Sequence, residues 1–267
     1  NRKGNVIYIL LPAYNEASNI LPLLDALAGE AQAWQAKNPG EDNPEWAVHA
    51  VVIDDGSTDA TGEMARRFSG PIQLTVLEHS TNQGLAAALR TGIDFVLQTG
   101  SSGDWVVTLD ADRTHHPRYV FRLVEKLRTG RDIVVASRYA PGGREYGVPL
   151  WRKWLSHGAR FTYRMFFPSV PLQDFSCGYR GFSWDLLRKT VEQWGSRLFE
   201  APGFACTGEL MLKMLGHTAP ARVTEIPFEL HYEAKGGKSK MPAFQTILGT
   251  LELLFRARRW LKNFHSG

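Results

Sequence analysis

The segment "WAVHAVVIDDGSTDATGEMARRF", Trp46 to Phe68, contains the pattern that indicates the fold of this chain. It begins with an apolar run of the length and composition of a buried strand. An acidic turn, "DDGSTD", follows, and the residues after the turn have the composition of a short helix. A strand, a polar turn and a helix in this order predict a βαβ unit, in which successive strands are parallel.

The same unit recurs on both sides of this segment. Apolar runs at 6–14, 72–80, 103–112 and 132–139 read as further strands, and stretches with helical spacing separate them. Strand and helix therefore alternate as far as Tyr139, which predicts an α/β fold with a mostly parallel sheet and helices on both faces. Beyond Tyr139 we expect a basic aromatic helix, a turn-rich insert at 172–183, one more helix and a strand at 221–233.

Polar motifs follow four of the expected strands. They are "PAYNE", "DDGSTD", "DAD" and "SRY". In open α/β sheets, ligands bind at the carboxyl ends of the strands. Four such motifs are difficult to assign to solvated loops alone, so we expect a binding site at this edge of the sheet.

Composition narrows the functional classes without choosing one. The 267 residues, 43% of them hydrophobic, suffice for one large α/β domain or two small ones. The net charge of +4 suits an anionic ligand, a nucleic acid or a membrane surface, or only a solvated surface. Cys177 and Cys206 have no metal-site spacing, which favours a reducing, cytosolic setting. No apolar run reaches the ~18 residues of a membrane span.

Asp110 and Asp112 stand two residues apart at the expected end of the fourth strand. Side chains two apart on a strand point to the same side, so both carboxylates can face one ligand. Paired carboxylates repel each other unless a cation neutralises them, and Mg²⁺ or Mn²⁺ suits such hard oxygen ligands. A solvated loop is the alternative. For the adjacent His115 and His116 we expect a polar helix entry in preference to a transition-metal site.

Six motifs resemble, in the same order, those of the inverting glycosyltransferases of family 2: "LPAYNE", "VVIDDGSTDAT", "NQGLAAALRTGI", "LDAD", "VVASRY" and "DFSCGYRGF". "RKWLSHGARF" and "GGKSKM" resemble in particular the polyprenyl-phosphate branch, which dolichol-phosphate mannose synthases typify. The likeness extends from about Val6 to Met241. It implies a GT-A-like, Rossmann-like fold and transfer of a hexose, with inversion, from a nucleotide-diphosphate sugar to a polyprenyl phosphate. GDP-mannose is the first donor expected and UDP-glucose the second.

The resemblance also implies the donor site. Pro12, Tyr14 and Glu16 match the family segment that contacts base and ribose, and Asp55, with Ile53 beside it, matches the acid at the second strand end. An acidic side chain can accept hydrogen bonds from ribose hydroxyls or a base amine. Tyr14 could instead be a core contact, Glu16 a charge at a helix N-terminus and Asp55 a helix cap.

By the same resemblance, Asp110 and Asp112 are metal ligands and, with Ala111 between them, donor contacts. The implied cofactor is a divalent cation, Mg²⁺ or Mn²⁺. Where the family often has leucine and glutamine after this motif, this chain has Arg113 and Thr114. Threonine is a shorter ligand than glutamine and arginine is a permanent cation, so we expect metal binding to be weaker here.

An acceptor phosphate would need cations more than a base. A lipid monophosphate carries about −1.5 to −2 charges near neutral pH, by analogy with phosphoserine, and is already a nucleophile. Arginines should therefore hold it against the donor diphosphate. Arg138, and Arg152 with Ser156, match the family's acceptor-phosphate site, and the i, i+4 spacing places Arg152 and Ser156 on one helix face. A solvated basic helix is the alternative.

Three later motifs supply further candidates. Asp174 and Arg180 match a segment that the family places near the sugar, where Asp174 binds sugar hydroxyls or pairs with Arg180. Glu209 resembles an acid near the active site, or is a surface helix charge. Lys240, in the loop "GGKSK", could cover donor phosphates. The expected catalytic residues are Asp110, Asp112, Arg138 and Asp174.

Residues 1–241 are expected to form one catalytic domain, and 242–267 an amphipathic C-terminal helix. This helix and residues 150–167 combine aromatic residues with cations, as helices at a membrane interface do, although packing on the domain is the alternative. We therefore expect a peripheral enzyme on the cytoplasmic face of a membrane, with no membrane-spanning helix in the chain.

Two other functional classes remain open. A family 2 enzyme with a hydroxyl or polysaccharide acceptor would need a carboxylate base. A nucleotide- or nucleic-acid-binding protein would want a broad basic face with few acids, whereas acids stand at three strand ends here. Nucleic acid is therefore not an expected partner.

Overall fold

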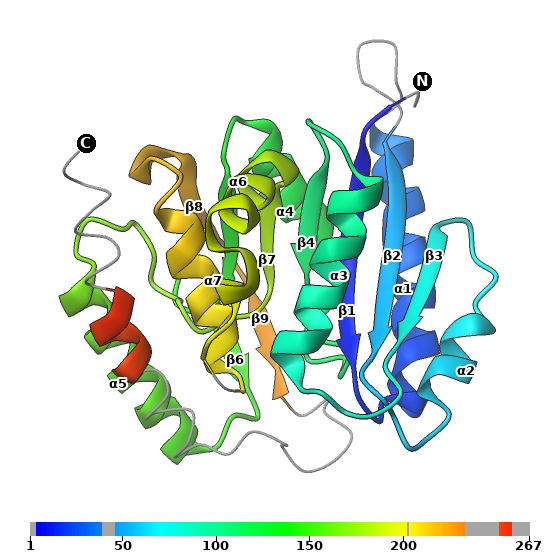
Figure 1. The fold of residues 1–267 in the computed structure, drawn as a ribbon, viewed down its shortest axis with the longest axis horizontal. Helices are drawn as coiled ribbons and strands as arrows, with labels where there is room; N and C mark the ends of the chain where they lie inside the picture. The colour runs from blue at the N-terminus through cyan, green and yellow to red at the C-terminus, as the bar shows by residue number, and fades with distance from the viewer. Residues whose placement is uncertain (1–3, 39–45, 202, 233–250, 258–267) are drawn as a thin grey trace.

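The computed structural model describes residues 4–38, 46–201, 203–232 and 251–257. Its centre is a seven-stranded sheet in the order β3-β2-β1-β4-β7-β5-β8 (Figure 1). The strands are β1 Val6–Ala13, β2 Ala47–Asp54, β3 Gln73–Glu78, β4 Trp105–Thr108, β5 Ile133–Ser137, β7 Arg180–Ser183 and β8 Val223–Pro227. All pairings are parallel except those of β7, which runs antiparallel between β4 and β5. The five strands expected up to Tyr139 are thus confirmed.

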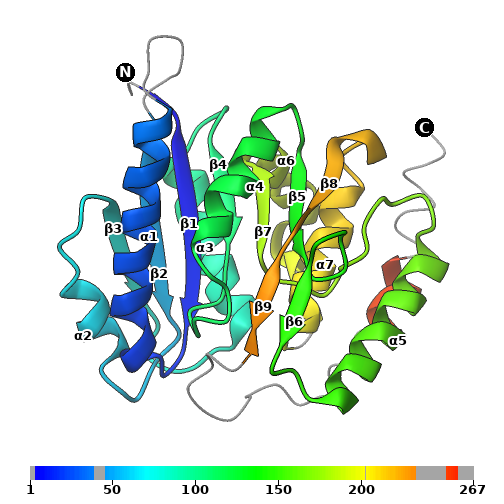
Figure 2. The same ribbon diagram turned by 180° about the vertical axis from the view of Figure 1, so that it is seen from behind.

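Helices cover both faces of this sheet, as expected. On one face lie α1 (Ala17–Lys37) and α4 (Arg118–Arg128), with α2 (Thr61–Arg66) packed beside α1. On the other lie α3 (Leu85–Thr99), α6 (Trp184–Trp194) and α7 (Ala205–Leu215), as Figures 1 and 2 show from opposite sides. Two 3₁₀ helices, η1 and η2, span Gly195–Leu198 and Pro220–Arg222.

The core lies between the sheet and these two helix layers. Ile7, Ile9, Leu10 and Leu11 of β1 have no exposed surface, because helices cover both faces of a central parallel strand. On the α1 face, Trp34 stacks on Phe121 of α4 with ring centroids 5.2 Å apart. Each fully buried aliphatic or phenylalanine side chain of this core contributes about 1.5–3 kcal/mol to the stability of the fold, because its apolar surface is removed from water.

The strand expected at 221–233 is in fact two strands in two sheets. β8 ends at Pro227, and β9 (Glu229–His231) pairs in parallel with β6 (Arg144–Tyr146). Proline has no backbone N–H to continue a ladder. Phe228, between the two strands, is fully buried, and its ring contacts that of Tyr119 at 5.1 Å. The break therefore turns an aromatic side chain into the core.

A long helix, α5 (Leu150–Phe166), lies at one end of the molecule, and residues 251–257 lie beside it (Figure 1). In this C-terminal stretch, Leu253 and Leu254 are fully buried, and Phe255 contacts the ring of Phe166 at 5.4 Å. The described part of the expected extension at 242–267 thus packs on the rest of the chain. No helix within the described ranges combines the length and the hydropathy that crossing a bilayer requires.

Candidate active site

A cleft of about 890 Å³ opens at the carboxyl ends of the parallel strands. One wall, here called the donor wall, comes from the ends of β1, β2 and β4 and from the start of α3. The opposite wall, the acceptor wall, comes from the end of β5, from α5, from the start of α7 and from residues 228–232 and 251–254. The donor wall is rich in acids, whereas most of the acceptor wall is apolar. The cleft lies where the strand-end motifs predict a site.

Most of the expected donor residues line the donor wall. They are Pro12, Tyr14, Glu16, Asp55, Asp110, Ala111 and Asp112. The exception is Ile53, whose side chain has no exposed surface. It packs against α3 so closely that a Cβ at Gly92 would stand 2.9 Å from its Cδ1. The structure therefore places the Ile53 side chain in the core and not in the cleft.

The loop after β1 is tied to the acidic turn after β2. The backbone N–H of Asn15 donates to Ser57 Oγ at 2.9 Å, and that of Glu16 donates to Thr61 Oγ1 at 2.8 Å. Asn15 adopts φ 55°, a left-handed conformation that asparagine tolerates better than most residues. Glu16 is at the N-cap position of α1, as its alternative assignment proposed, and also lines the cleft. These bonds fix Tyr14 and Glu16 relative to Asp55.

The two aspartates after β4 are both partly exposed in the cleft. Thr114, which is buried, donates to Asp112 Oδ1 through its hydroxyl at 2.6 Å and its backbone N–H at 3.1 Å. It therefore orients Asp112, and it lines the cleft beside that carboxylate. Arg113 is exposed and takes φ 64°, which turns the chain between the aspartates and α4. His115 is buried and stacks on Tyr179 at 5.0 Å, and it also lines the cleft, where its Nδ1 accepts from the backbone N–H of Asp110 at 3.1 Å.

Arg138 lies at the end of β5 and lines the cleft. Its Nε and Nη2 donate to the two carboxylate oxygens of Asp174 at 2.7 and 2.9 Å, and Glu145 stands 3.5 Å from Nη1. Burial works against both charges, but the neighbouring carboxylate raises the pKa of Arg138 well above its usual value. In the same way Arg138 lowers the pKa of Asp174 against the effect of burial. The pair is therefore ionised throughout the neutral range.

The expected ion pair between Asp174 and Arg180 is not formed, because Asp174 pairs with Arg138 instead. The Asp174 side chain has no exposed surface and bonds Arg138, Ser176 Oγ and the Cys177 N–H. It is closed to a sugar hydroxyl in this arrangement. In the described ranges, Arg180 pairs with no carboxylate and donates instead to the carbonyls of Phe175 and Thr207. Burial lowers the pKa of Arg180.

The expected acceptor helix is α5, and Ser156 on it lines the cleft together with Arg138. The backbone of Arg152 lies one turn earlier in α5, but its side chain is outside the described residues, and so is Lys240. The structure thus brings Ser156 and Arg138 to one cleft.

Glu209 is not a surface charge. It is fully buried and accepts from the backbone N–H groups of Glu200 and Ala201 at 2.7 Å each. Its partner is Lys213, also buried, at 2.9 Å. The sequence did contain a signal, because Glu209 and Lys213 have i, i+4 spacing on a helix that is apolar all round, and such a helix is buried.

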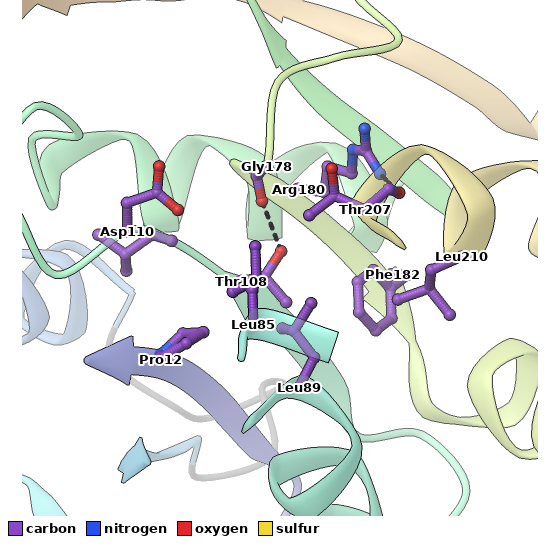
Figure 3. Close-up of a pocket in the computed structure, with 11 residues that line it drawn as sticks. Pro12, Leu85, Leu89, Thr108, Asp110, Gly178, Arg180, Phe182, Thr207 and Leu210 are labelled. Atoms are coloured by element: carbon purple, nitrogen blue, oxygen red, sulfur yellow. Dashed lines mark hydrogen bonds between the residues drawn. The ribbon is translucent and has the colours of Figure 1, made fainter. Parts of the chain in front are cut away.

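A second cavity, of about 20 Å³, adjoins the cleft and shares lining residues with it, among them Asp110 and Gly178 (Figure 3). Pro12, Leu85 and Phe182 border it, and Thr108 beside it donates to the Gly178 carbonyl at 2.7 Å. A volume of this size holds about one water molecule. The large cleft is therefore the candidate active site.

The mostly parallel sheet with helices on both faces has solved counterparts among GT-A glycosyltransferases. Glucosyl-3-phosphoglycerate synthase of Mycobacterium tuberculosis, solved with Mn²⁺, UDP and glucosyl-3-phosphoglycerate, superposes with a TM-score of 0.65 at 19% identity over 96% of this chain and 80% of that one. Mannosyl-3-phosphoglycerate synthase of Rubrobacter xylanophilus gives 0.66 at 15% identity over 97% and 75%. At such identities the likeness shows the fold alone, and it confirms the GT-A-like class.

The chain belongs to glycosyltransferase family 2. Residues 8–191 match that family, "Glycosyl transferase family 2". The undecaprenyl-phosphate mannosyltransferase of Micrococcus luteus is 31% identical over 95% of this chain and 93% of that protein. The dolichol-phosphate mannosyltransferase of Pyrococcus furiosus is 30% identical over 95% and 64%, and the polyprenol monophosphomannose synthase of Mycolicibacterium smegmatis 33% over 68% and 63%. The chain thus spans less than two thirds of the length of these last two relatives.

Proposed function

We propose that the protein transfers a hexose, with mannose favoured, from a nucleotide-diphosphate sugar to a polyprenyl phosphate with inversion at the anomeric carbon. The observation that carries the proposal is a single cleft that joins the acidic donor wall to Arg138 and Ser156 and continues into an apolar wall. A donor, an anionic acceptor head and a lipid chain each have a matching surface there. The names of the three relatives support the polyprenyl phosphate and the mannose.

The distribution of carboxylates supports a phosphate acceptor over a hydroxyl acceptor. Among the described residues, the carboxylates that line the cleft are Glu16, Asp55, Asp110 and Asp112, all on the donor wall. Near the acceptor wall, Asp174 and Glu145 have side chains 0% and 10% exposed, and both are held by Arg138. A hydroxyl would need one of them as a free base to remove its proton. A phosphate dianion is already deprotonated and needs only to be positioned.

Asp110 and Asp112 fit a hard divalent cation, Mg²⁺ or Mn²⁺. Two carboxylates next to each other in one cleft, with room for diphosphate oxygens and water, supply the ligands that such ions prefer. Among the described residues, no histidine, cysteine or further carboxylate forms a metal-binding cluster with these two aspartates. Oxygen atoms of the donor would therefore complete the coordination shell of the ion. When bound, the ion would neutralise charge on the departing nucleoside diphosphate. Related folds have been solved with Mn²⁺ and with Mg²⁺.

The chain's own residues would then bind and orient the reactants. Asp174 holds Arg138 on two bonds, so the guanidinium cannot rotate away from the cleft. Arg138 and the Ser156 hydroxyl would bind the acceptor phosphate between the donor wall and α5. The apolar acceptor wall would exclude water and receive the first part of the lipid chain. Tyr14, Glu16 and Asp55 would bind the nucleoside, and Lys240, outside the described residues, would cover the diphosphate.

A membrane surface would supply the acceptor, and α5 would lie at that surface. Leu150, Phe161 and Met165 on α5 are 74%, 67% and 65% exposed, an unusual density of large apolar side chains on one helix. Lys153, Arg160 and Arg164 lie on the same helix. Aromatic and apolar residues interleaved with cations suit an anionic lipid interface. We place the protein peripherally on the cytoplasmic face, with residues 1–241 as the catalytic domain and 242–267 as a second contact.

The test compares two acceptors of equal chain length, a polyprenyl phosphate and the corresponding polyprenol. Purified protein is given Mg²⁺ or Mn²⁺ and labelled GDP-mannose or UDP-glucose, and label is counted in the organic phase. We expect transfer to the phosphate alone, loss of transfer with a chelator and recovery with excess metal. Transfer to the polyprenol at a similar rate would contradict the assigned acceptor.

A further inference from the structure

Asp55 at the end of β2 is held by three donors from a segment that follows β3. Its Oδ1 accepts from His79 Nδ1 at 2.7 Å and from the Gln83 N–H at 2.9 Å, and its Oδ2 accepts from the Gly84 N–H at 2.7 Å. A carboxylate offers about four acceptor positions, two on each oxygen. Oδ1 is therefore saturated, while Oδ2 keeps one position at the edge of the cleft.

His79 is fixed at both ends of its ring. Its side chain is 8% exposed, and its Nε2 lies 2.9 Å from Thr91 Oγ1 in the second turn of α3. An ionised carboxylate only accepts hydrogen bonds, so Nδ1 carries the proton that faces Asp55. The backbone N–H of His79 donates to the carbonyl of Asp54 at 2.9 Å. Thr91, His79 and Asp55 thus form a chain of bonds from α3 to the end of β2.

The segment 79–84 forms part of the donor wall, where Asn82 and Gly84 line the cleft beside Asp55. A second contact fixes it against the acidic turn. Gly56 adopts φ 65°, and a Cβ there would stand 2.2 Å from the backbone carbon of Thr81. The turn after β2 and the segment after β3 therefore touch backbone to backbone. A shift of the segment would move Asp55 and the cleft wall together.

We propose that His79 is a positioning residue for the donor nucleoside. By saturating Oδ1 of Asp55 it leaves the free acceptor position on Oδ2 for a hydroxyl or amine of the nucleoside, and it holds segment 79–84 as the neighbouring wall. This inference rests on the proposed function and deepens it, because it assigns a selective role within the donor site. His79 acts through Asp55 and need not touch the donor.

Two substitutions by amide side chains distinguish the two hydrogen bonds that the His79 ring makes. In His79→Asn the side-chain amide nitrogen takes the place of Nδ1, so the bond to Asp55 is kept and that to Thr91 is lost. In His79→Gln the amide nitrogen takes the place of Nε2, so the bond to Thr91 is kept and that to Asp55 is lost. A hydrogen bond to a charged group contributes enough that its loss changes affinity by about tenfold or more.

We expect His79→Gln to raise the KM for the nucleotide sugar about tenfold with kcat changed less than about threefold, and His79→Asn to stay within about threefold of the wild type in both. The affinity for GDP and UDP, measured by calorimetry, should follow the same order. Backbone amides of residues 79–84 should exchange hydrogen faster in His79→Gln than in His79→Asn, because the first variant frees Asp55 from its side-chain anchor.

Equal KM values in both variants, or a common fall in kcat with unchanged KM, would overturn the proposal and leave His79 with a general stabilising role. The exchange and nucleotide-affinity measurements do not depend on sugar transfer. If the wild type failed to glycosylate a polyprenyl phosphate, the proposed function would fall, while these two measurements would still decide the role of His79.

Discussion

The pairing of Arg138 with Asp174 determines what the acceptor side of the cleft can bind. With its Nε and Nη2 engaged by a carboxylate that has no exposed surface, the guanidinium is rigid and its charge is largely compensated. The proposed acceptor phosphate would therefore share Arg138 with Asp174, and Ser156 would supply a hydroxyl from the facing helix. A rigid, shared arginine orients an anion more than it attracts one.

Asp174→Asn should destabilise the fold, because it leaves the buried Arg138 charge without its main partner. We expect the free energy of unfolding to fall by about 3 kcal/mol. This is the lower end of the range for a broken buried ion pair, because Glu145 remains 3.5 Å from Nη1 of Arg138. Urea unfolding measures it. Glu192→Gln, which removes an exposed i, i+4 pair with Arg188, is the matched control and should change stability by less than about 0.5 kcal/mol. Equal effects of the two substitutions would refute the assignment.

The same pair predicts how stability depends on pH. Arg138 lowers the pKa of Asp174 in the folded state, although burial opposes this. The folded protein therefore binds this proton less readily than the unfolded chain does. The contribution of Asp174 is complete above the ordinary aspartate pKa of about 3.9 and is lost as pH falls through the lower folded-state pKa. Urea titrations between neutral pH and about pH 3 should show this loss in the wild type and a flatter profile in Asp174→Asn.

At the scale of elements, α7 and α5 have opposite surroundings, and this gives them different roles. α7 is enclosed, and its Glu209–Lys213 pair anchors the chain at residues 197–201 through backbone bonds. The segment so anchored leads into Phe204, which lines the cleft. α5 instead exposes apolar residues to solvent and meets the rest of the chain along one side. Both helices line the acceptor wall, and of the two α5 also presents large apolar side chains to solvent.

Lys213→Met should cost about 3–5 kcal/mol of unfolding free energy, because it leaves the Glu209 charge buried without its cation. The double variant Glu209→Met with Lys213→Met should recover part of this loss, because no buried charge is then left unpaired, although the N–H groups of Glu200 and Ala201 lose their acceptor. In a double-mutant cycle measured by urea unfolding, the coupling energy should therefore have the opposite sign to the change in unfolding free energy caused by either single substitution. Additive losses would show that the two side chains act independently.

Phe161→Ser tests the proposed contact of α5 with lipid. The side chain is 67% exposed, so the free energy of unfolding should change by less than about 0.5 kcal/mol. Removing one large apolar side chain from a membrane contact should weaken cosedimentation with anionic vesicles roughly tenfold. Gln193→Ser, at an exposed position of α6, is the control and should bind like the wild type. Unchanged vesicle binding by Phe161→Ser would remove α5 from the interface.

For the whole molecule, the two halves of the chain supply the two walls of one cleft. The ends of β1, β2 and β4 build the donor wall, whereas residues after Tyr139 build most of the acceptor wall. The antiparallel strand β7 brings these halves together, because it pairs with β4 on one side and β5 on the other. The proposed donor and acceptor sites therefore face each other over the centre of the sheet.

The positions of the strand-end acids in the fold could be predicted because the information for them is local. Apolar periodicity located the strands, and each polar motif directly follows its strand, so Asp55, Asp110 and Asp112 could be placed by counting. Asp174 could not be placed in this way, since the choice between Arg138 and Arg180 as partner depends on how β7 inserts into the sheet. Ile53 shows the same limit. Neighbouring residues of a strand point to opposite faces of the sheet, and whether a helix covers the face of Ile53 is known only from the packed structure.

The most direct measurement of the central claim is label transfer by the wild-type protein from GDP-mannose, with UDP-glucose in parallel, to a polyprenyl phosphate in anionic vesicles with Mg²⁺. We expect a labelled lipid whose formation requires the polyprenyl phosphate and is faster from GDP-mannose, with the anomeric configuration inverted relative to the donor. No labelled lipid from either donor, or a product that retains the donor's configuration, would contradict it.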